Sequence, residues 1–258
     1  MIKQIPNIIT LLNLFFGCLA IITIMQTGLT VSIDASGEQT IAIPQKIYWA
    51  SVFIGIAAVI DFFDGFFARL LKAPSDMGKQ LDSLADMVSF GVAPGLIIYQ
   101  FLRLSFASQV NGLDVTVGWL LPALIIPCAG AYRLARFNID TTQANEFKGV
   151  PIPAAGLLIA SFPLIYWFSN SNWQIQLLQN KWFWYMVICI ISYLMITKLP
   201  MLALKFKEFS LKNTMPFIII LFVTLISAFW VGWMAVPISF ITYVLVSLVF
   251  RKKVQSSL

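Results

Sequence analysis

The chain has 258 residues, of which 59% are hydrophobic and 11% charged, and its mean hydropathy is +0.86. This composition excludes an ordinary soluble domain and indicates a polytopic helical membrane protein, because apolar runs of about 17–25 residues recur along the chain. The absence of histidine excludes imidazole bases and histidine-ligated metals, and three isolated cysteines indicate neither a disulfide framework nor a metal site.

The first predicted span begins at Pro6 and is treated as a retained membrane helix, since no small-residue cleavage site follows a short apolar core. Asn7, Thr10 and Asn13 follow at intervals of three and therefore share one helix face. This pattern predicts either that the three side chains form hydrogen bonds between helices or that they line one wall of a polar cavity.

Four carboxylates lie in the second and third predicted spans: Asp61 and Asp64 near the end of one, Asp82 and Asp86 near the start of the next. Intervals of three and four residues place each pair on one helix face. Because a charge at membrane depth is costly, such a cluster indicates a functional site rather than a structural pair with Arg69.

The remaining spans complete an all-α bundle of about eight transmembrane helices with both termini cytoplasmic. Fourteen of the 17 basic residues fall on the predicted cytoplasmic face, against three on the other (Lys46, Arg103 and Lys181), and this asymmetry sets the orientation. The net charge of +6 is explained by this orientation better than by nucleic-acid binding. The predicted spans are 6–25, 47–71, 79–104, one ending near 138, one beginning at 151, 182–197, and a pair dividing 215–250 near Gly232.

Carboxylates gathered in this way repel one another, and one or two divalent cations would remove the repulsion. Such a centre suits phosphoryl chemistry, with Arg69 as a further cation and a carboxylate as general base. The residues alone do not identify that base. A cation-coupled transporter that uses the acids as an ion site is the alternative from another class.

Eight positions at fixed spacing resemble the motif of the CDP-alcohol phosphatidyltransferase family: Asp61, Asp64, Gly65, Ala68, Arg69, Gly78, Asp82 and Asp86. The resemblance implies transfer of a phosphatidyl group from a CDP-linked lipid to an alcohol, with release of CMP. It also implies a site for two ions of Mg²⁺ or Mn²⁺ and a homodimer.

The resemblance further assigns roles to the motif positions. Asp61, Asp64 and Asp82 would bind the metal, and Asp86 would lie at the metal site as the general base. A further set would bind the nucleotide and the phosphates: Asn7, Thr10, Gly65, Ala68, Arg69 and Gly78.

Three further stretches, beginning at Pro6, Tyr132 and Gly149, resemble the membrane-embedded branch that converts CDP-diacylglycerol and L-serine into phosphatidylserine. Arg133, Arg136 and Lys148 are then candidates for the serine site. The usual excess of basic residues on the cytoplasmic face explains either arginine equally well. Glycerol 3-phosphate or an inositol phosphate is the alternative acceptor. We expect a core over residues 1–200 and a C-terminal region over 201–258 with a basic loop and two further spans. The active site is expected at the cytoplasmic side of the cell membrane.

Overall fold

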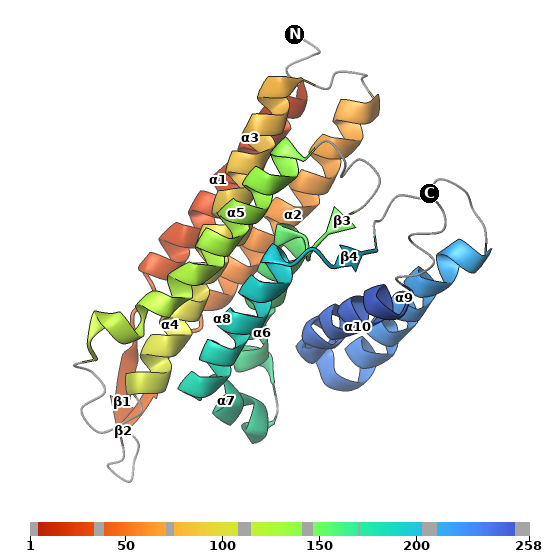
Figure 1. Cartoon of the computed structure of the whole chain (residues 1–258). Helices are drawn as coiled ribbons and strands as arrows, with labels where there is room; N and C mark the ends of the chain where they lie inside the picture. The colour runs from red at the N-terminus through yellow and green to blue at the C-terminus, as the bar shows by residue number, and fades with distance from the viewer. Residues whose placement is uncertain are drawn as a thin grey trace.

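The computed structural model describes residues 5–33, 39–70, 75–107, 115–140, 147–169, 171–202 and 211–250. Figure 1 shows a bundle of helices accompanied by two short two-stranded sheets. In chain order the elements are α1 (Ile5–Met25), β1 (Thr30–Ile33), β2 (Gln39–Ala42), α2 (Ile47–Leu70), α3 (Asp76–Asp86), the π-helix η2 (Met87–Val92), α4 (Ala93–Ala107), the 3₁₀ turns η4 (Val117–Trp119) and η5 (Leu121–Leu124), α5 (Ile125–Ile139), β3 (Phe147–Lys148), α6 (Ile152–Phe168), α7 (Asn172–Leu178), α8 (Lys181–Ile196), β4 (Pro200–Met201), α9 (Leu211–Val231), the 3₁₀ turn η7 (Gly232–Met234) and α10 (Ala235–Val249).

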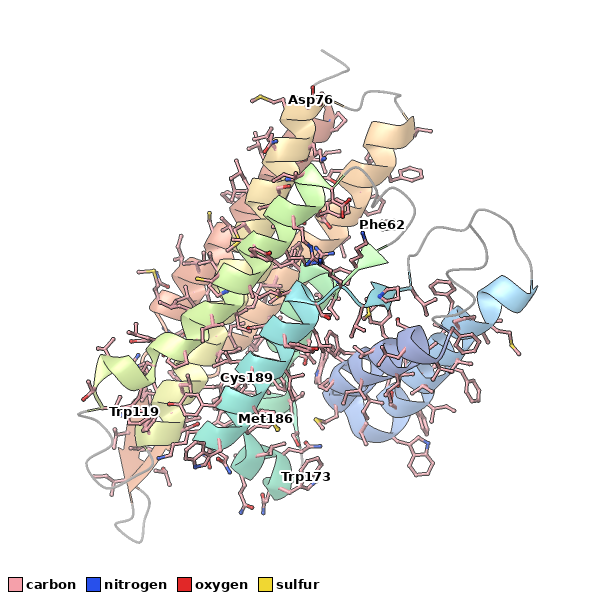
Figure 2. The ribbon with its side chains drawn as sticks, viewed as in Figure 1. Phe62, Asp76, Trp119, Trp173, Met186 and Cys189 are labelled. Carbon is pink, nitrogen blue, oxygen red and sulfur yellow. The ribbon has the colours of Figure 1, made fainter. Side chains whose placement is uncertain are left out.

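Four helical segments are long and apolar enough to cross a membrane: Pro6–Met25, Ile47–Phe67, Asp76–Ala107 and Met215–Val249. Helices α6 and α8 are apolar but shorter. Figure 2 shows Asp76 at one end of the bundle and the exposed Trp119 and Trp173 at the other, and tryptophan is common where spans meet the membrane surface. These features confirm a mostly helical protein with four candidate membrane spans among the described residues, whereas the count of eight spans and the cytoplasmic termini stay predictions.

Most predicted helix boundaries agree with the structure to within a few residues, and the break near Gly232 is confirmed. Gly232 has a φ of +56°, a left-handed conformation that suits glycine at the turn between α9 and α10. The helix that carries Asp82 begins at Asp76, three residues before the predicted start, because the Ser75 hydroxyl caps it by accepting the Gly78 N–H at 3.0 Å.

Five short elements lie in segments that the sequence predicted as loops: the strands β1, β2, β3 and β4 and the helix α7. An antiparallel hairpin pairs β1 with β2, with Thr30 opposite Ala42, and α7 follows α6. Part of the predicted basic loop, residues 203–210, lies outside the described residues.

The π-helix η2 lies at the centre of the bundle and packs against α1, α5 and α6. Its wide turn is shown by the hydrogen bond that the Ala93 N–H donates to the Val88 carbonyl oxygen, five residues earlier in the chain. Two glycines allow close approach: a Cβ on Gly17 would lie 2.3 Å from Ser89 Oγ, and one on Gly156 would lie 2.8 Å from Phe90 Cβ. The segment that follows Asp86 is therefore held from two sides by helix backbone.

A short sheet ties the end of α8 to the segment before α6. Strands β3 and β4 are antiparallel, with Phe147 opposite Met201, and the Gly149 N–H donates to the Leu199 carbonyl at 2.8 Å. The α9–α10 hairpin packs against β4 and α6, beside the rest of the bundle, as Figure 1 shows.

The packing predicts that Gly17→Ala lowers the melting temperature of the purified protein in detergent. The new methyl group overlaps Ser89, and overpacking of this kind costs about 1–3 kcal/mol. Gly55→Ala is the matched control, because it lies in α2 and a Cβ there meets nothing within 4 Å. Equal melting temperatures for the two variants would contradict the close packing of α1 on η2.

Candidate functional site

The four predicted carboxylates come together between α2 and α3. Carboxylate oxygens of Asp61, Asp64 and Asp82 all lie within 4.8 Å of one another. Asp61 also interacts with the side chains of Asp82 and Asp86. Asp64 and Asp86 are buried, while Asp61 and Asp82 are half-buried and form the more open side of the cluster.

Helix α1 supplies two buried polar side chains to this cluster. The Thr10 hydroxyl donates to Asp64 Oδ2 at 2.7 Å, and Asn13 Nδ2 donates to Asp86 Oδ1 at a longer 3.4 Å. Of the two alternatives for the polar face of the first span, hydrogen bonds between helices are confirmed, and their partners are the carboxylates of the cluster. The sequence placed Asn13 on this face without assigning it to the site.

Ser89 is a further residue that the sequence did not single out. Its hydroxyl donates to the Asn13 carbonyl oxygen at 3.1 Å and is fully buried. It lies three residues after Asp86 and therefore on the same helix face. A small polar side chain on that face was the sequence signal that could have identified it. Ser89 fixes the part of α1 that contacts Asp86.

The donor set fits a divalent cation. In the described part of the chain, none of the four carboxylates makes an ion pair with a basic side chain. Three carboxylates with converging oxygens are ligands of the kind that Mg²⁺ and Mn²⁺ prefer, and a bound cation would offset their mutual repulsion. Asp61, Asp64 and Asp82 are the residues that would hold it, with Asp86 beside them.

The glycines of the motif differ in their surroundings. A Cβ on Gly65 would meet nothing within 4 Å, so space is open beside Asp64 for a ligand. A Cβ on Gly78 would lie 3.1 Å from Asn7 Oδ1, so the Asn7 side chain lies against the first turn of α3. The side chains of Ala68 and Arg69 lie outside the described residues.

Arg133 lies on α5, which packs against the segment η2 that follows Asp86. Its side chain is buried with 6% exposure, and it interacts electrostatically with Asp86. Its Nε has no hydrogen-bond partner in the described part of the chain. A buried guanidinium with an unused donor, next to a carboxylate cluster, is suited to hold an anionic ligand group.

The other two acceptor candidates are engaged elsewhere. Arg136 donates to the Ile196 carbonyl at 2.7 Å and the Thr197 carbonyl at 3.2 Å, at the end of α8. Lys148 forms an ion pair with Asp140 at 3.3 Å. The structure therefore separates Arg133 from the two residues with which the sequence grouped it.

Comparison with known proteins adds two findings to this geometry. The family model described as CDP-alcohol phosphatidyltransferase matches residues 3–182, which include all eight motif positions. A CDP-diacylglycerol–serine O-phosphatidyltransferase of Bacillus subtilis (strain 168) is 32% identical over 197 residues, covering 76% of this chain and 89% of the relative.

Two other relatives are matched over less of their length. An archaetidylserine synthase of Methanothermobacter thermautotrophicus is 33% identical over 170 residues, and a CDP-diacylglycerol–serine O-phosphatidyltransferase of Helicobacter pylori (strain J99) is 34% identical over 172. Each match covers 65% of this chain and 61% of the relative, so the chain spans less than two thirds of these two proteins.

The cluster predicts that the purified protein binds Mn²⁺, and that Asp82→Asn weakens this binding at least tenfold by removing one charged ligand. Titration followed by electron paramagnetic resonance measures the affinity directly, without reference to activity. Asp76→Asn is the matched control, because Asp76 is exposed at the start of the same helix and outside the cluster. The same loss in both variants would indicate a nonspecific charge effect and contradict a metal site.

Proposed function

This chain belongs to the CDP-alcohol phosphatidyltransferase family, and from that premise we propose that it transfers the phosphatidyl group of CDP-diacylglycerol to L-serine. The products would be phosphatidylserine and CMP. One observation carries the proposal: four carboxylates at the family's spacing gather beside a buried arginine with an unused donor. The names of the relatives support serine as the acceptor.

In the proposed reaction, the serine hydroxyl oxygen attacks the phosphorus that carries the diacylglycerol. The bond from that phosphorus to the CMP oxygen breaks, and CMP leaves with the negative charge. One or two ions of Mg²⁺ or Mn²⁺, when bound, would neutralise the pyrophosphate and stabilise the attacking and leaving oxygens. The open space beside Gly65 would admit the nucleotide end of the lipid.

Asp86 is proposed to take the proton of the serine hydroxyl. Its burial beside the other carboxylates supports this role, because Asn13 donates to one of its oxygens and Arg133 interacts with it electrostatically. Thr10 would orient Asp64 by donating to it, so that the other Asp64 oxygen lines the cluster. Without histidine in the chain, a carboxylate is the plausible base.

Arg133 is proposed to bind the serine carboxylate. Serine carries a carboxylate next to the reacting hydroxyl, and a guanidinium close to Asp86 would hold it at a suitable distance for proton transfer. Asn7, Ala68, Arg69 and Gly78 remain proposed contacts of the nucleotide and phosphates.

The proposal includes the wider arrangement of the protein. Residues 1–200 would form the catalytic core and residues 201–258 an added C-terminal region. The excess of basic residues on one face supports an active site on the cytoplasmic side of the cell membrane. A homodimer is carried over from the family.

The test of the activity is incorporation of radiolabelled serine into lipid by the purified protein with CDP-diacylglycerol and Mn²⁺. We expect labelled phosphatidylserine and an equal amount of CMP. Glycerol 3-phosphate and an inositol phosphate are tested in parallel, and preference for either would overturn the serine assignment while leaving the family chemistry in place.

In the same assay, Arg133→Lys should raise the KM for serine about ten- to a hundredfold, the loss expected for a charge-assisted hydrogen bond of about 1.5–3 kcal/mol. The KM for CDP-diacylglycerol should change little. Arg136→Lys is the matched control, because Arg136 is occupied by the carbonyls of α8 and should affect the melting temperature instead. A serine KM that rises only in Arg136→Lys would contradict the assignment.

Asp86→Asn preserves the shape of the side chain but removes its basicity. General base catalysis contributes about 10²–10⁴-fold, so kcat should fall by that factor while CDP-diacylglycerol still binds. Mn²⁺ affinity is measured on the same variant, since loss of the cation would lower kcat for a different reason. A variant with normal turnover would place the base elsewhere.

A further inference from the structure

Helices α5 and α8 pack side by side and run in the same direction. Near the start of α8, the Tyr185 hydroxyl donates to the carbonyl of Trp119, in the turn η4 before α5, at 2.8 Å. At the other end, Arg136 of α5 donates to the Ile196 carbonyl at 2.7 Å. The two contacts join start to start and end to end, so residues one turn before Arg136 and one turn before Ile196 lie at about the same level.

Ser192 lies on the side of α8 that faces α5. It follows Tyr185 by seven residues and precedes Ile196 by four, and these intervals place the three residues on one side of a helix. Because Tyr185 and Ile196 provide the contacts with η4 and α5, Ser192 lies between them at this interface. Ser192 is one turn before Ile196, and Arg133 is one turn before Arg136. The hydroxyl and the buried guanidinium are therefore at the same level.

This level is also that of the carboxylate cluster, because α5 runs antiparallel to the continuous helix that carries Asp82 and Asp86. Near one end of the pair, Asn138 Nδ2 donates to Ser83 Oγ at 2.8 Å. Near the other end, a Cβ on Gly95 would lie 2.9 Å from Pro127 Cδ.

Arg133 lies about midway between Asn138 and Pro127. The segment η2 lies about midway between Ser83 and Gly95, and α5 packs against it. The level shared by Arg133 and Ser192 is therefore that of the turn directly after Asp86.

The Ser192 hydroxyl differs from other buried hydroxyls on the helices. Ser105 donates to the Phe101 carbonyl at 2.8 Å, and Ser247 donates to the Tyr243 carbonyl at 2.7 Å, each four residues earlier in its own helix. Ser192 is only 6% exposed, yet its Oγ has no hydrogen-bond partner in the described part of the chain. A buried hydroxyl without a partner costs stability, and a ligand that supplies the partner recovers it.

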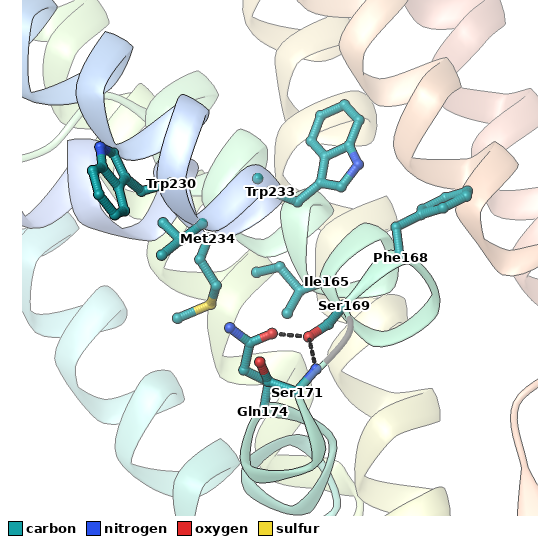
Figure 3. A pocket seen from close by; sticks show the side chains of 10 residues that line it. Ile165, Phe168, Ser169, Ser171, Gln174, Trp230, Trp233 and Met234 are labelled. Carbon is teal, nitrogen blue, oxygen red and sulfur yellow. Dashed lines mark hydrogen bonds between the residues drawn. The ribbon is translucent and has the colours of Figure 1, made fainter.

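A buried polar side chain beyond the end of α6 shows the usual arrangement. Figure 3 shows a cavity between this end and the turn η7, lined by Trp233 and Gln174 among others. Gln174 is about as buried as Ser192, but it accepts a hydrogen bond from Ser169, whose oxygen accepts the Ser171 N–H. This polar side chain is satisfied within the protein, whereas the Ser192 hydroxyl is not.

L-Serine presents three polar groups on a small carbon frame: a hydroxyl, a carboxylate and an ammonium. In the proposed function the hydroxyl faces Asp86 and the carboxylate binds Arg133, which leaves the ammonium. An ammonium carries three donors and no acceptor, so it requires oxygen atoms, and a neutral hydroxyl oxygen can accept from it. The Ser192 hydroxyl is a buried oxygen at the level of Arg133 with this capacity unused.

We propose that Ser192 accepts a hydrogen bond from the ammonium group of the acceptor and is thus a specificity-determining residue. It would favour an amino acid over an alcohol that carries a phosphate. This inference rests on the proposed function, since it takes Arg133 as the group that binds the serine carboxylate. Together with Asp86 and Arg133, Ser192 gives the acceptor three points of attachment.

The experiment compares L-serine with 3-hydroxypropionate, which is the same molecule without its amino group. At saturating CDP-diacylglycerol, the KM for serine and the Ki of 3-hydroxypropionate as a competitor of labelled serine are measured for the wild-type protein and Ser192→Ala. The KM for serine should rise about tenfold, as expected for loss of a hydrogen bond to a charged group, while the Ki stays unchanged. The melting temperature should not fall, because the variant removes a polar atom that has no partner among the described residues.

Ser51→Ala is the matched control. Ser51 is also buried, and its Oγ also has no hydrogen-bond partner in the part of the chain that the structure describes. It lies ten residues before Asp61 on α2, which is about 15 Å along the helix axis. The control variant should leave the KM for serine and the Ki of 3-hydroxypropionate unchanged.

Three outcomes would overturn the inference. If Arg133→Lys raises the serine KM and Ser192→Ala does not, Ser192 has no part in the acceptor site and the proposed function stands. If Ser192→Ala raises the serine KM and the Ki by the same factor, the hydroxyl does not bind the ammonium group. If the wild-type protein transfers nothing to serine but accepts another alcohol, the proposed function itself is wrong and the inference falls with it.

Discussion

The structure depends on keeping four carboxylates together in a bundle that is otherwise apolar. Asp61, Asp64, Asp82 and Asp86 repel one another, and burial makes the repulsion stronger because water screens it less. Thr10 and Asn13 offset part of the cost with hydrogen bonds. The repulsion that these two hydrogen bonds do not offset is large enough that a cation is the natural complement of the cluster. The close packing of α1 on the segment after Asp86 keeps these donors in place.

Much of this site could be predicted from the sequence because its geometry is local. Intervals of three and four residues place carboxylates on one helix face whatever the tertiary structure, and Gly232 marked a turn through its backbone freedom. Arg133 and Arg136 could not be distinguished in this way, since both lie near the end of the same helix. What separates them is contact with α8, some 60 residues later in the chain. Short elements such as α7 were missed because a helix of seven residues carries little periodicity.

Two side chains that interact with Asp86 each have a polar atom with no hydrogen-bond partner among the described residues: Asn13 Oδ1 and Arg133 Nε. Both side chains are more than nine-tenths buried, so each orphaned atom lowers the stability of the fold. Arg136, on the same helix as Arg133, is by contrast paired with the end of α8. Several buried polar atoms without hydrogen-bond partners around one residue are typical of a functional site, where some fold stability is lost in favour of ligand binding.

The π-helix after Asp86 also has a consequence for the angular register of the long helix Asp76–Ala107. An α-helix advances about 100° per residue, so the wider turn at Met87–Val92 rotates the faces of α3 and α4 relative to each other. The carboxylate face of α3 and the apolar face of α4 are therefore set independently, although both belong to one continuous helix. Loss of a single residue in this segment would turn the acids away from α2 even if every aspartate were retained. Insertions and deletions here would consequently be tolerated far less than substitutions.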